Sequence, residues 1–414
     1  MASIDKNEQA PHIIIDFGSN TIKFGFNYDP FPKFIIPNVV GKIKNKSFSL
    51  IKDYNDYYCG YEALNNGPAI DLTYPRIEND GQILSTMEGQ KELESLFSYI
   101  LYEKLKLKTQ KDKYNIFIVD SILTSTKERE AIAHILFEKF DVYNLHFEPQ
   151  SIMTLYSTSK TSGLIVDSGE ISTEIVPIIE GYIISQGICN FPIGGCQLTK
   201  RFANVYQDIF DMYNVCNQYW MAQKIKEEYS EILPSNKEFE DLMSKPINKK
   251  EYSLPDGNTV ELGNEIYEIP ESIFNPNMID IQTDNLPKVI LDSINKCDIS
   301  TRKELFNNII LGGGNTFIKG FEGRLKNEIN SMKKRNCGII CLKERKYSSW
   351  IGASGISSLS NFNKWISRND YFEHGGKLFE YDYLFNFNDR QRKKMKKEAN
   401  RTDDIYRKLG PNII

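Results

Sequence analysis

The feature that most constrains this chain is a short pattern that occurs twice. Asp16 follows three isoleucines and Asp167 follows Leu164-Ile165-Val166, and each aspartate stands two positions before a glycine. A second run of strand-forming residues comes after each glycine, so both segments predict a β-hairpin whose turn presents free backbone N–H groups beside one carboxylate. Such N–H groups bind phosphate oxygens, and carboxylates hold magnesium through its waters. The pattern therefore predicts two hairpins that grip a polyphosphate from both sides.

The two aspartates are 151 positions apart, which is much longer than the period of a short tandem repeat. This spacing indicates two related half-domains. Strand-like and helix-like segments alternate along the chain, which is typical of an α/β fold with mixed sheets flanked by helices. The length of 414 residues agrees with about two to three domains.

Hydrophobic periodicity and turn residues predict where the main elements lie. A meander of three strands is expected at 13–17, 21–26 and 33–40, and further strands at 116–119, 309–311 and 338–342. Helices are expected at 91–107, 131–140, 150–156, 286–297 and 320–328, with mostly helical structure at 197–243 and a hairpin at 252–262.

The bulk composition argues against several classes of protein. The net charge of −4 gives no global attraction to nucleic acid or to an anionic membrane. No apolar run is long enough to span a bilayer, and the N-terminus lacks the apolar core of a signal peptide. The seven cysteines show no CxxC spacing, and there are only four histidines, so neither a disulfide framework nor a structural zinc site is expected. We expect free thiols in a cytoplasmic or nuclear protein.

The last part of the chain changes character at about residue 376. It contains an aromatic run at 381–385 and a basic run at 390–397. A solvated helix or tail is one interpretation. A nuclear address or a nucleic-acid contact is the other, and the sequence does not distinguish them.

At Asp16, Asp167 and Gly312-Gly313-Gly314-Asn315 the sequence resembles actin and the actin-related proteins, collinearly over about residues 12–375. The hairpin pattern alone is weak, because sugar kinases, chaperone ATPases and exopolyphosphatases share it. Two clusters are specific to actin: Lys296-Cys297-Asp298 with Arg302-Lys303, and Tyr347-Ser348-Ser349-Trp350-Ile351-Gly352.

The resemblance implies an actin-like ATPase fold with two related lobes around a nucleotide cleft. The first lobe would comprise 1–41, 75–157 and 347–380, with 42–74 as a second subdomain carrying an exposed loop. The second lobe would comprise 158–194 and 283–346, with 195–282 as a fourth subdomain. Residues 381–414 would form a basic C-terminal extension.

The resemblance also implies ATP or ADP as ligand, with Mg²⁺ or Ca²⁺ held by Asp16 and Asp167 through water. The residues that it places at the nucleotide are Ser19, Lys23, Gly169, Gly195, Lys226, Glu227, Gly313, Gly314, Asn315, Phe317 and Lys346. Without the resemblance, the glycines indicate tight turns, Lys226-Glu227 indicates a solvated helix face, and the aspartates indicate turn caps.

Hydrolysis in this family requires a water in line with the terminal phosphate, and Gln150 matches the glutamine that helps to place it. The family's histidine on the second hairpin is replaced by Glu174, and a glycine in the same turn is replaced by Ile171, while Glu170 stands at the family's second acidic position. We therefore expect at most a slow ATPase.

The leading hypothesis is an actin-related protein that binds nucleotide as a structural ligand within a cytoskeletal or nuclear multiprotein assembly. The alternatives are a divergent actin that polymerises with ATP turnover, and a small-molecule phosphotransferase or phosphohydrolase on the same fold. Protein partners of an actin-type assembly are implied, including actin or actin-related subunits. An amphipathic helix of a partner is expected in a cleft lined by Tyr156, Ile356, Leu359 and Phe362, for which ordinary core packing is the alternative.

Overall fold

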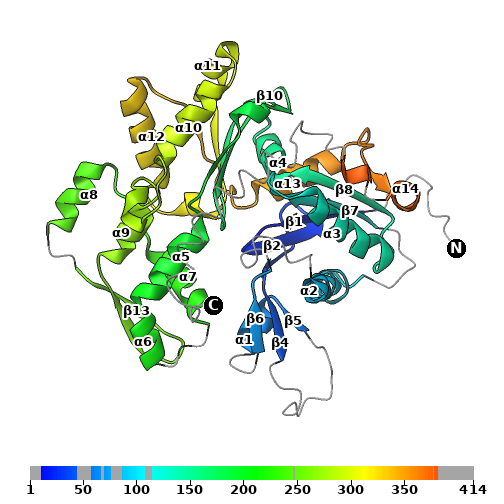
Figure 1. Ribbon diagram of the computed structural model, residues 1–414, viewed down its shortest axis with the longest axis horizontal. Coiled ribbons are helices and arrows are strands. Elements are labelled where there is room, and N and C mark those ends of the chain that lie inside the picture. Colours follow the sequence, from blue (N-terminus) through cyan, green and yellow to red (C-terminus); the bar gives the residue numbers. More distant parts are fainter. Residues whose placement is uncertain are drawn as a thin grey trace. The chain divides into compact units, whose positions relative to one another are not determined.

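The computed structural model describes residues 11–43, 57–66, 70–75, 86–107, 114–213, 215, 217–245, 248–375 and 377–380. These residues divide into two compact units, whose elements are traced in Figure 1. The first unit contains the described residues of Met1–Ala63, Thr73–Ser159 and Tyr347–Tyr383, and the second those of Leu64–Leu72 and Lys160–Lys346. The exposed loop expected at 43–56 lies outside the described residues from residue 44 on, and so does the basic region from 381.

The first unit is built on a six-stranded sheet of order β17-β8-β7-β1-β2-β3. Its strands are β1 (His12–Phe17), β2 (Thr21–Phe26), β3 (Phe34–Pro37), β7 (Asn115–Asp120), β8 (Asn144–Pro149) and β17 (Ile366–Ser367). The first three form the predicted antiparallel meander, whereas β1, β7 and β8 run parallel. A separate antiparallel ladder joins β4 (Val40–Ile43) to β5 (Tyr57–Cys59).

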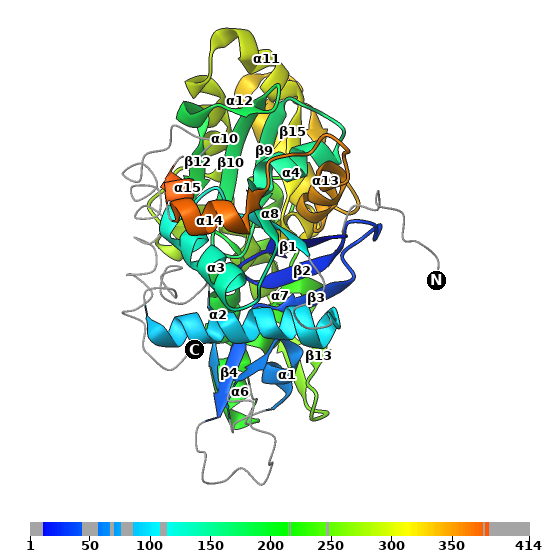
Figure 2. The same ribbon diagram turned by 90° about the vertical axis from the view of Figure 1, so that its right-hand side faces the viewer.

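Helices cover both faces of this sheet (Figures 1 and 2). They are α2 (Met87–Ser98), continued by the π-helix η4 (Tyr99–Lys104), α3 (Thr126–Glu138), α4 (Gln150–Ser157), α13 (Ser348–Ser357), α14 (Arg368–His374) and α15 (Lys377–Glu380). Ile13 and Ile15 of β1 share a buried cluster with Leu96 of α2 and Ile132 of α3. On the other side, the indole N–H of the fully buried Trp350 in α13 donates to the Ile14 carbonyl at 3.2 Å.

The second unit repeats this strand order. Its sheet runs β11-β10-β9-β15-β16, with β12 also paired to β10. The strands are β9 (Gly163–Ser168), β10 (Thr173–Ile179), β11 (Tyr182–Ile183), β12 (Cys189–Phe191), β15 (Ile309–Gly312) and β16 (Ile339–Ile340). As in the first unit, an antiparallel hairpin is followed by parallel strands on its first strand's free side. This common topology is the structural form of the duplicated sequence pattern.

Most of the remaining elements belong to the second unit. They are η5 (Ser185–Gly187), α5 (Gly195–Val205), α6 (Gln207–Met212), α7 (Gln218–Tyr229), α8 (Asn236–Met243), β13 (Lys250–Ser253), β14 (Thr259–Leu262), α9 (Glu265–Glu271), η6 (Pro276–Ile279), α10 (Leu286–Lys296), α11 (Ile299–Asn307), η7 (Gly314–Phe317) and α12 (Phe321–Lys333). At the junction of the two units along the chain lie α1 (Tyr61–Asn65) and β6 (Ile70–Thr73).

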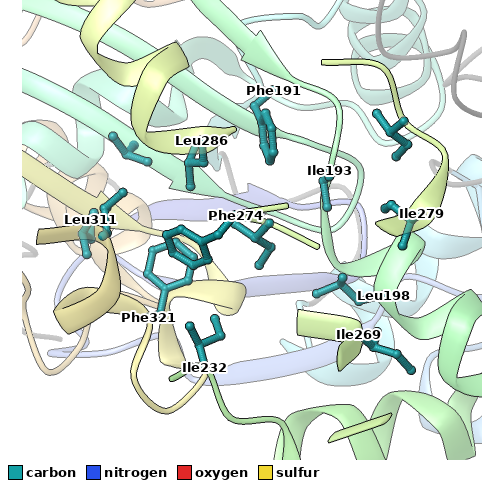
Figure 3. Close-up of a cluster of buried hydrophobic side chains, with 14 of the residues drawn as sticks. Phe191, Ile193, Leu198, Ile232, Ile269, Phe274, Ile279, Leu286, Leu311 and Phe321 are labelled. Carbon is teal, nitrogen blue, oxygen red and sulfur yellow. The ribbon is translucent and has the colours of Figure 1, made fainter. Parts of the chain in front are cut away.

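The core of the second unit is one continuous apolar cluster, part of which Figure 3 shows. The rings of Phe274 and Phe321 meet edge to face, with centroids 6.1 Å apart. Beside them, Arg324 of α12 forms a bidentate ion pair with Glu271 of α9, and both side chains are buried. Burial raises the pKa of Glu271, and the charge of Arg324 opposes this rise. The pair therefore locks α9 to α12 within an otherwise apolar interior.

The prediction of a single strand over 33–40 is wrong in its second half. The ladder of β3 ends at Pro37, which has no N–H to donate. Asn38 then turns the chain: its backbone N–H donates to the Asn20 carbonyl at 2.8 Å and its side-chain amide to the Gly18 carbonyl at 2.9 Å. Within the described part of the chain, no helix has both the length and the apolar character needed to cross a membrane.

The close approach of α13 to α4 depends on one glycine. A Cβ at Gly352 would lie 1.9 Å from the Met153 carbonyl oxygen, whereas a Cβ at Gly355, on the same helix, would have no neighbour within 4 Å. We predict that Gly352→Ala destabilises the first unit by about 1–3 kcal/mol, because the two helices must move apart. Gly355→Ala is the matched control and should be neutral or stabilising by up to about 1 kcal/mol.

Urea unfolding followed by tryptophan fluorescence and far-UV circular dichroism measures both variants. Equal unfolding free energies for the two variants would contradict this account of the helix contact.

Candidate functional site

The first hairpin holds its aspartate in a buried, charge-balanced position. Asp16 and Lys23 are cross-strand partners in the β1–β2 ladder, and the Lys23 ammonium donates to the Asp16 carboxylate at 3.0 Å. The Ser349 hydroxyl, from the start of α13, donates to the same Asp16 oxygen at 2.8 Å. Because an unpaired buried carboxylate is costly, the two donors stabilise Asp16, which is only 1% exposed.

The turn between these strands comprises Gly18, Ser19 and Asn20, and it lies beyond the last pair of the β1–β2 ladder, Phe17–Ile22. A Cβ at Gly18 would lie 2.6 Å from the Thr21 carbonyl oxygen, so the turn itself requires glycine there. The turn thus carries Ser19 at its tip, three positions after Asp16 and four positions before Lys23.

Gln150 comes to the same edge of this sheet. The strands β1, β7 and β8 are parallel, so their carboxyl ends meet at one edge, where binding sites of α/β sheets occur. Gln150 directly follows β8 as the first residue of α4, and Asp120 ends the neighbouring strand β7. Asp120 is occupied by a buried bidentate ion pair with Arg129 of α3. Burial by itself would lower the pKa of the Arg129 guanidinium. The charge and hydrogen bonds of Asp120 outweigh this effect, so the pKa of Arg129 is raised.

In the second hairpin a different residue stands opposite the aspartate. Asp167 of β9 pairs across the ladder with Glu174 of β10, and Glu174 pairs in turn with Asn190 of β12. Directly opposite residues point to the same face, with Cβ atoms about 4.5–5.5 Å apart. Three oxygen-bearing side chains therefore form one row across the sheet. Both polar side-chain atoms of Asn190 are buried and, among the described residues, lack a hydrogen-bond partner.

Position 313, beside Asp167, requires glycine for two physical reasons. Its φ of +80° is unfavourable for residues with a side chain, and its Cβ would lie 2.2 Å from the Ser168 carbonyl oxygen and 2.6 Å from Asp167 Oδ1. Gly312, the residue before it, pairs with Asp167 in the β15–β9 ladder. Gly313, directly after β15, therefore allows close packing against the Asp167 carboxylate.

The prediction that the second turn presents free backbone N–H groups is wrong for Gly169. Its N–H donates to the Ser172 carbonyl at 3.1 Å, which closes the turn on itself. Its carbonyl accepts from the Gly195 N–H at 2.9 Å and from the Asn315 amide at 2.7 Å. The Asn315 amide also reaches Ser168 Oγ at 3.2 Å. Gly169, Gly195 and Asn315, which the resemblance places at the nucleotide, are thus joined to one another by hydrogen bonds within the protein.

A buried ion-pair network continues from this turn. Lys226 of α7 donates to the Gly195 carbonyl at 3.0 Å, and its ammonium lies 3.8 Å from Glu170 Oε2. The Tyr219 hydroxyl, also on α7, donates to Glu170 Oε1 at 2.7 Å. Lys226 is only 4% exposed, so the interpretation of this residue as part of a solvated helix face is wrong. Glu227, next in the chain, is exposed and accepts from the Gln223 amide.

The other residues expected at the base and sugar lie after β15. Phe317 is 45% exposed, and the Arg345 guanidinium carbon lies 3.7 Å above its ring. Arg345 is fixed by bonds to the Thr316 hydroxyl and carbonyl. Gly314 has open space around its Cβ position, and Lys346 is half-buried.

Sequence reasoning missed Ser349, Tyr219 and Arg345. Ser349 belongs to a cluster already noted for the resemblance, but nothing in the pattern connects it to Asp16, which is 333 positions away. Tyr219 lies on a helix whose apolar spacing accounts for a tyrosine without any polar role. Arg345 stands beside Lys346, so the basic pair was visible but not which member contacts Phe317.

Comparisons with known proteins agree with this architecture. The family model described as Actin matches residues 7–382. An actin-like protein of Neurospora crassa is 30% identical over 377 residues, which cover 89% of this chain and 97% of that protein. The chain therefore belongs to the actin family.

The bond from Tyr219 to Glu170 can be removed alone. We predict that Tyr219→Phe lowers the free energy of unfolding of the second unit by about 1.5–3 kcal/mol, since a buried carboxylate loses a donor. Tyr182→Phe is the control, because Tyr182 is 77% exposed, and it should change nothing measurable. Urea titration measures both variants, and indistinguishable midpoints would exclude a stabilising role for the Tyr219 hydroxyl.

Proposed function

We propose that this actin-related protein binds ATP or ADP with a divalent cation as a structural ligand and hydrolyses ATP slowly or not at all. In this proposal it is a subunit of a cytoskeletal or nuclear multiprotein assembly. The observation that carries the proposal is the contrast between the two hairpins. They share one register, but Lys23 stands opposite Asp16 whereas Glu174 stands opposite Asp167.

The first hairpin fits a phosphate group. Lys23 supplies a buried ammonium, and the turn with Ser19 offers backbone N–H groups outside the ladder. Asp16 and Asp167 would hold Mg²⁺ or Ca²⁺ through water, and such an ion neutralises phosphate charge when bound. Gly195, Lys226, Glu227, Gly313, Gly314, Asn315, Phe317 and Lys346 remain the proposed contacts to the rest of the nucleotide.

The second hairpin supports slow turnover. Asp167 and Glu174 place two carboxylates on one face, and the orphaned Asn190 amide beside them suits a cation or an ordered water. Like charge at Glu174 opposes the approach of the terminal phosphate. Gln150, proposed to position the attacking water, then lacks the family's histidine as its counterpart.

Nucleotide binding is tested on Lys23. We predict that Lys23→Met weakens the binding of a fluorescent N-methylanthraniloyl ATP by at least about tenfold, because a charge-assisted bond of about 1.5–3 kcal/mol is lost. Lys127→Met, at an exposed position of α3, is the control and should bind as the wild type does. Binding is measured by fluorescence titration with Mg²⁺, on variants whose circular dichroism shows them folded. Wild-type protein that does not bind the probe would remove the proposal.

Hydrolysis is tested on Glu174. We predict that Glu174→His increases the single-turnover rate of phosphate release at least about tenfold, since a positioned imidazole replaces a repelling carboxylate. Glu228→His, on the exposed face of α7, is the control with the same change of residue. A wild-type rate equal to that of conventional actin under the same conditions would show that Glu174 does not slow the reaction.

The surface for a partner is proposed on α4 and α13. Leu359 is 49% exposed just beyond the end of α13. Tyr156, on α4, and Ile356, on α13, are half-buried. Phe362 packs its ring against Phe117, so it contributes to the core more than to a groove.

Affinity purification of the full chain with identification of its partners tests the assembly. Pelleting with Mg²⁺ and salt together with phosphate release would instead favour a polymerising actin, and turnover in a substrate screen a phosphotransferase.

A further inference from the structure

Cys189, the first residue of β12, is paired with a cation. The Lys296 ammonium donates to Cys189 Sγ at 3.2 Å. Cys189 is 8% exposed, so its sulfur is largely shielded from water while it contacts this charge. A neighbouring ammonium stabilises a thiolate relative to the thiol, and the thiolate is the nucleophilic form.

A second thiol, Cys297, belongs to the same buried cluster. Cys297 follows Lys296 directly, and a Cβ at Gly187 would lie 2.7 Å from Cys297 Sγ. The Ser293 hydroxyl of α10 donates to the Gly187 carbonyl at 2.6 Å, so the end of α10 is bonded to the segment that leads into Cys189. Burial raises the pKa of Cys297 to about 11; the charge of Arg302 opposes this rise, and the charge of Cys189 adds to it. Cys189 and Cys297 therefore belong to one buried cluster and differ in character, since only Cys189 contacts an ammonium.

We propose that Cys189 and Cys297 form a reversible redox pair, in which Cys189 is the thiol that reacts with hydrogen peroxide and Cys297 is the thiol that resolves the product. The pair lies within the second unit, and the proposal does not rest on the proposed nucleotide binding.

The chemistry balances with peroxide as the oxidant. The Cys189 thiolate attacks one peroxide oxygen, the O–O bond breaks, and the leaving hydroxide takes a proton to become water, which leaves a sulfenic acid on Cys189. Cys297 then attacks that sulfur, the S–O bond breaks, a second water leaves, and a disulfide forms. Two thiols lose two electrons, peroxide becomes two waters, and a dithiol reductant reverses the reaction.

The test compares Cys189 with Cys341 in the same full-length protein. Cys341 is the more exposed thiol, and burial raises its pKa to about 11. After brief treatment with hydrogen peroxide, mass spectrometry should find a peptide containing a Cys189–Cys297 disulfide. In Cys297→Ser, dimedone should label Cys189 at least about tenfold faster than Cys341. In Cys189→Ser, Cys297 should give no adduct.

Lys296→Met should slow the labelling of Cys189 at least about tenfold, whereas Lys303→Met, an exposed lysine of α11, should not change it. Near-UV circular dichroism checks that each variant is folded, and the wild-type disulfide result does not depend on any substitution. The proposal is overturned if Cys341 reacts as fast as Cys189, if Lys296→Met reacts as the wild type does, or if oxidised wild-type protein contains no Cys189–Cys297 disulfide.

Discussion

The register of each hairpin decides which charge faces its aspartate. In a ladder, a shift of one residue moves every side chain to the other face, so the partner of a buried carboxylate is fixed by the whole apolar pattern of the strand. In the first unit this constraint places Lys23 opposite Asp16 and makes a buried acid tolerable. In the second unit the same register places Glu174 opposite Asp167, which concentrates negative charge. One topology thus places an ion pair in one hairpin and two acidic side chains opposite each other in the other.

The two turns also differ in how their backbone is used. In the first, the residues around Ser19 lie outside the ladder, and Asn38 bonds to the carbonyl side of the turn. In the second, Gly169 uses its N–H internally and its carbonyl to anchor Gly195 and Asn315. The network around Glu170 then fixes this turn to α7. The first turn therefore keeps its residues outside the ladder, whereas the second uses its backbone mainly to hold its own surroundings in place.

The sequence alone predicted the duplicated hairpins, the meander and the α/β class, because these depend on local periodicity and turn residues. It failed where contacts between distant residues decide the outcome. The contact of Ser349 with Asp16 spans 333 positions, and no local pattern reports it. The burial of Lys226 also depends on a distant turn, the one that contains Glu170. Helical spacing alone therefore predicted a solvent-exposed side chain for Lys226. At 33–40 the apolar run was real, but Pro37 and Asn38 ended the ladder inside it.

The strand β12 connects the acidic row with the thiol pair, although the two do not share a face. Asn190 lies opposite Glu174, whereas Cys189 lies opposite Ile175, so neighbouring side chains of the strand point to opposite sides of the sheet. A disulfide at Cys189 would therefore act on the acidic row only through the backbone of β12, by restraining its pairing with β10. Because β12 leads within four residues to Gly195, the same restraint would reach the closed turn at Gly169. Any coupling between the redox state of Cys189 and the second hairpin would therefore run through the backbone of β12, because strand alternation keeps the sulfur and the carboxylates on opposite faces of the sheet.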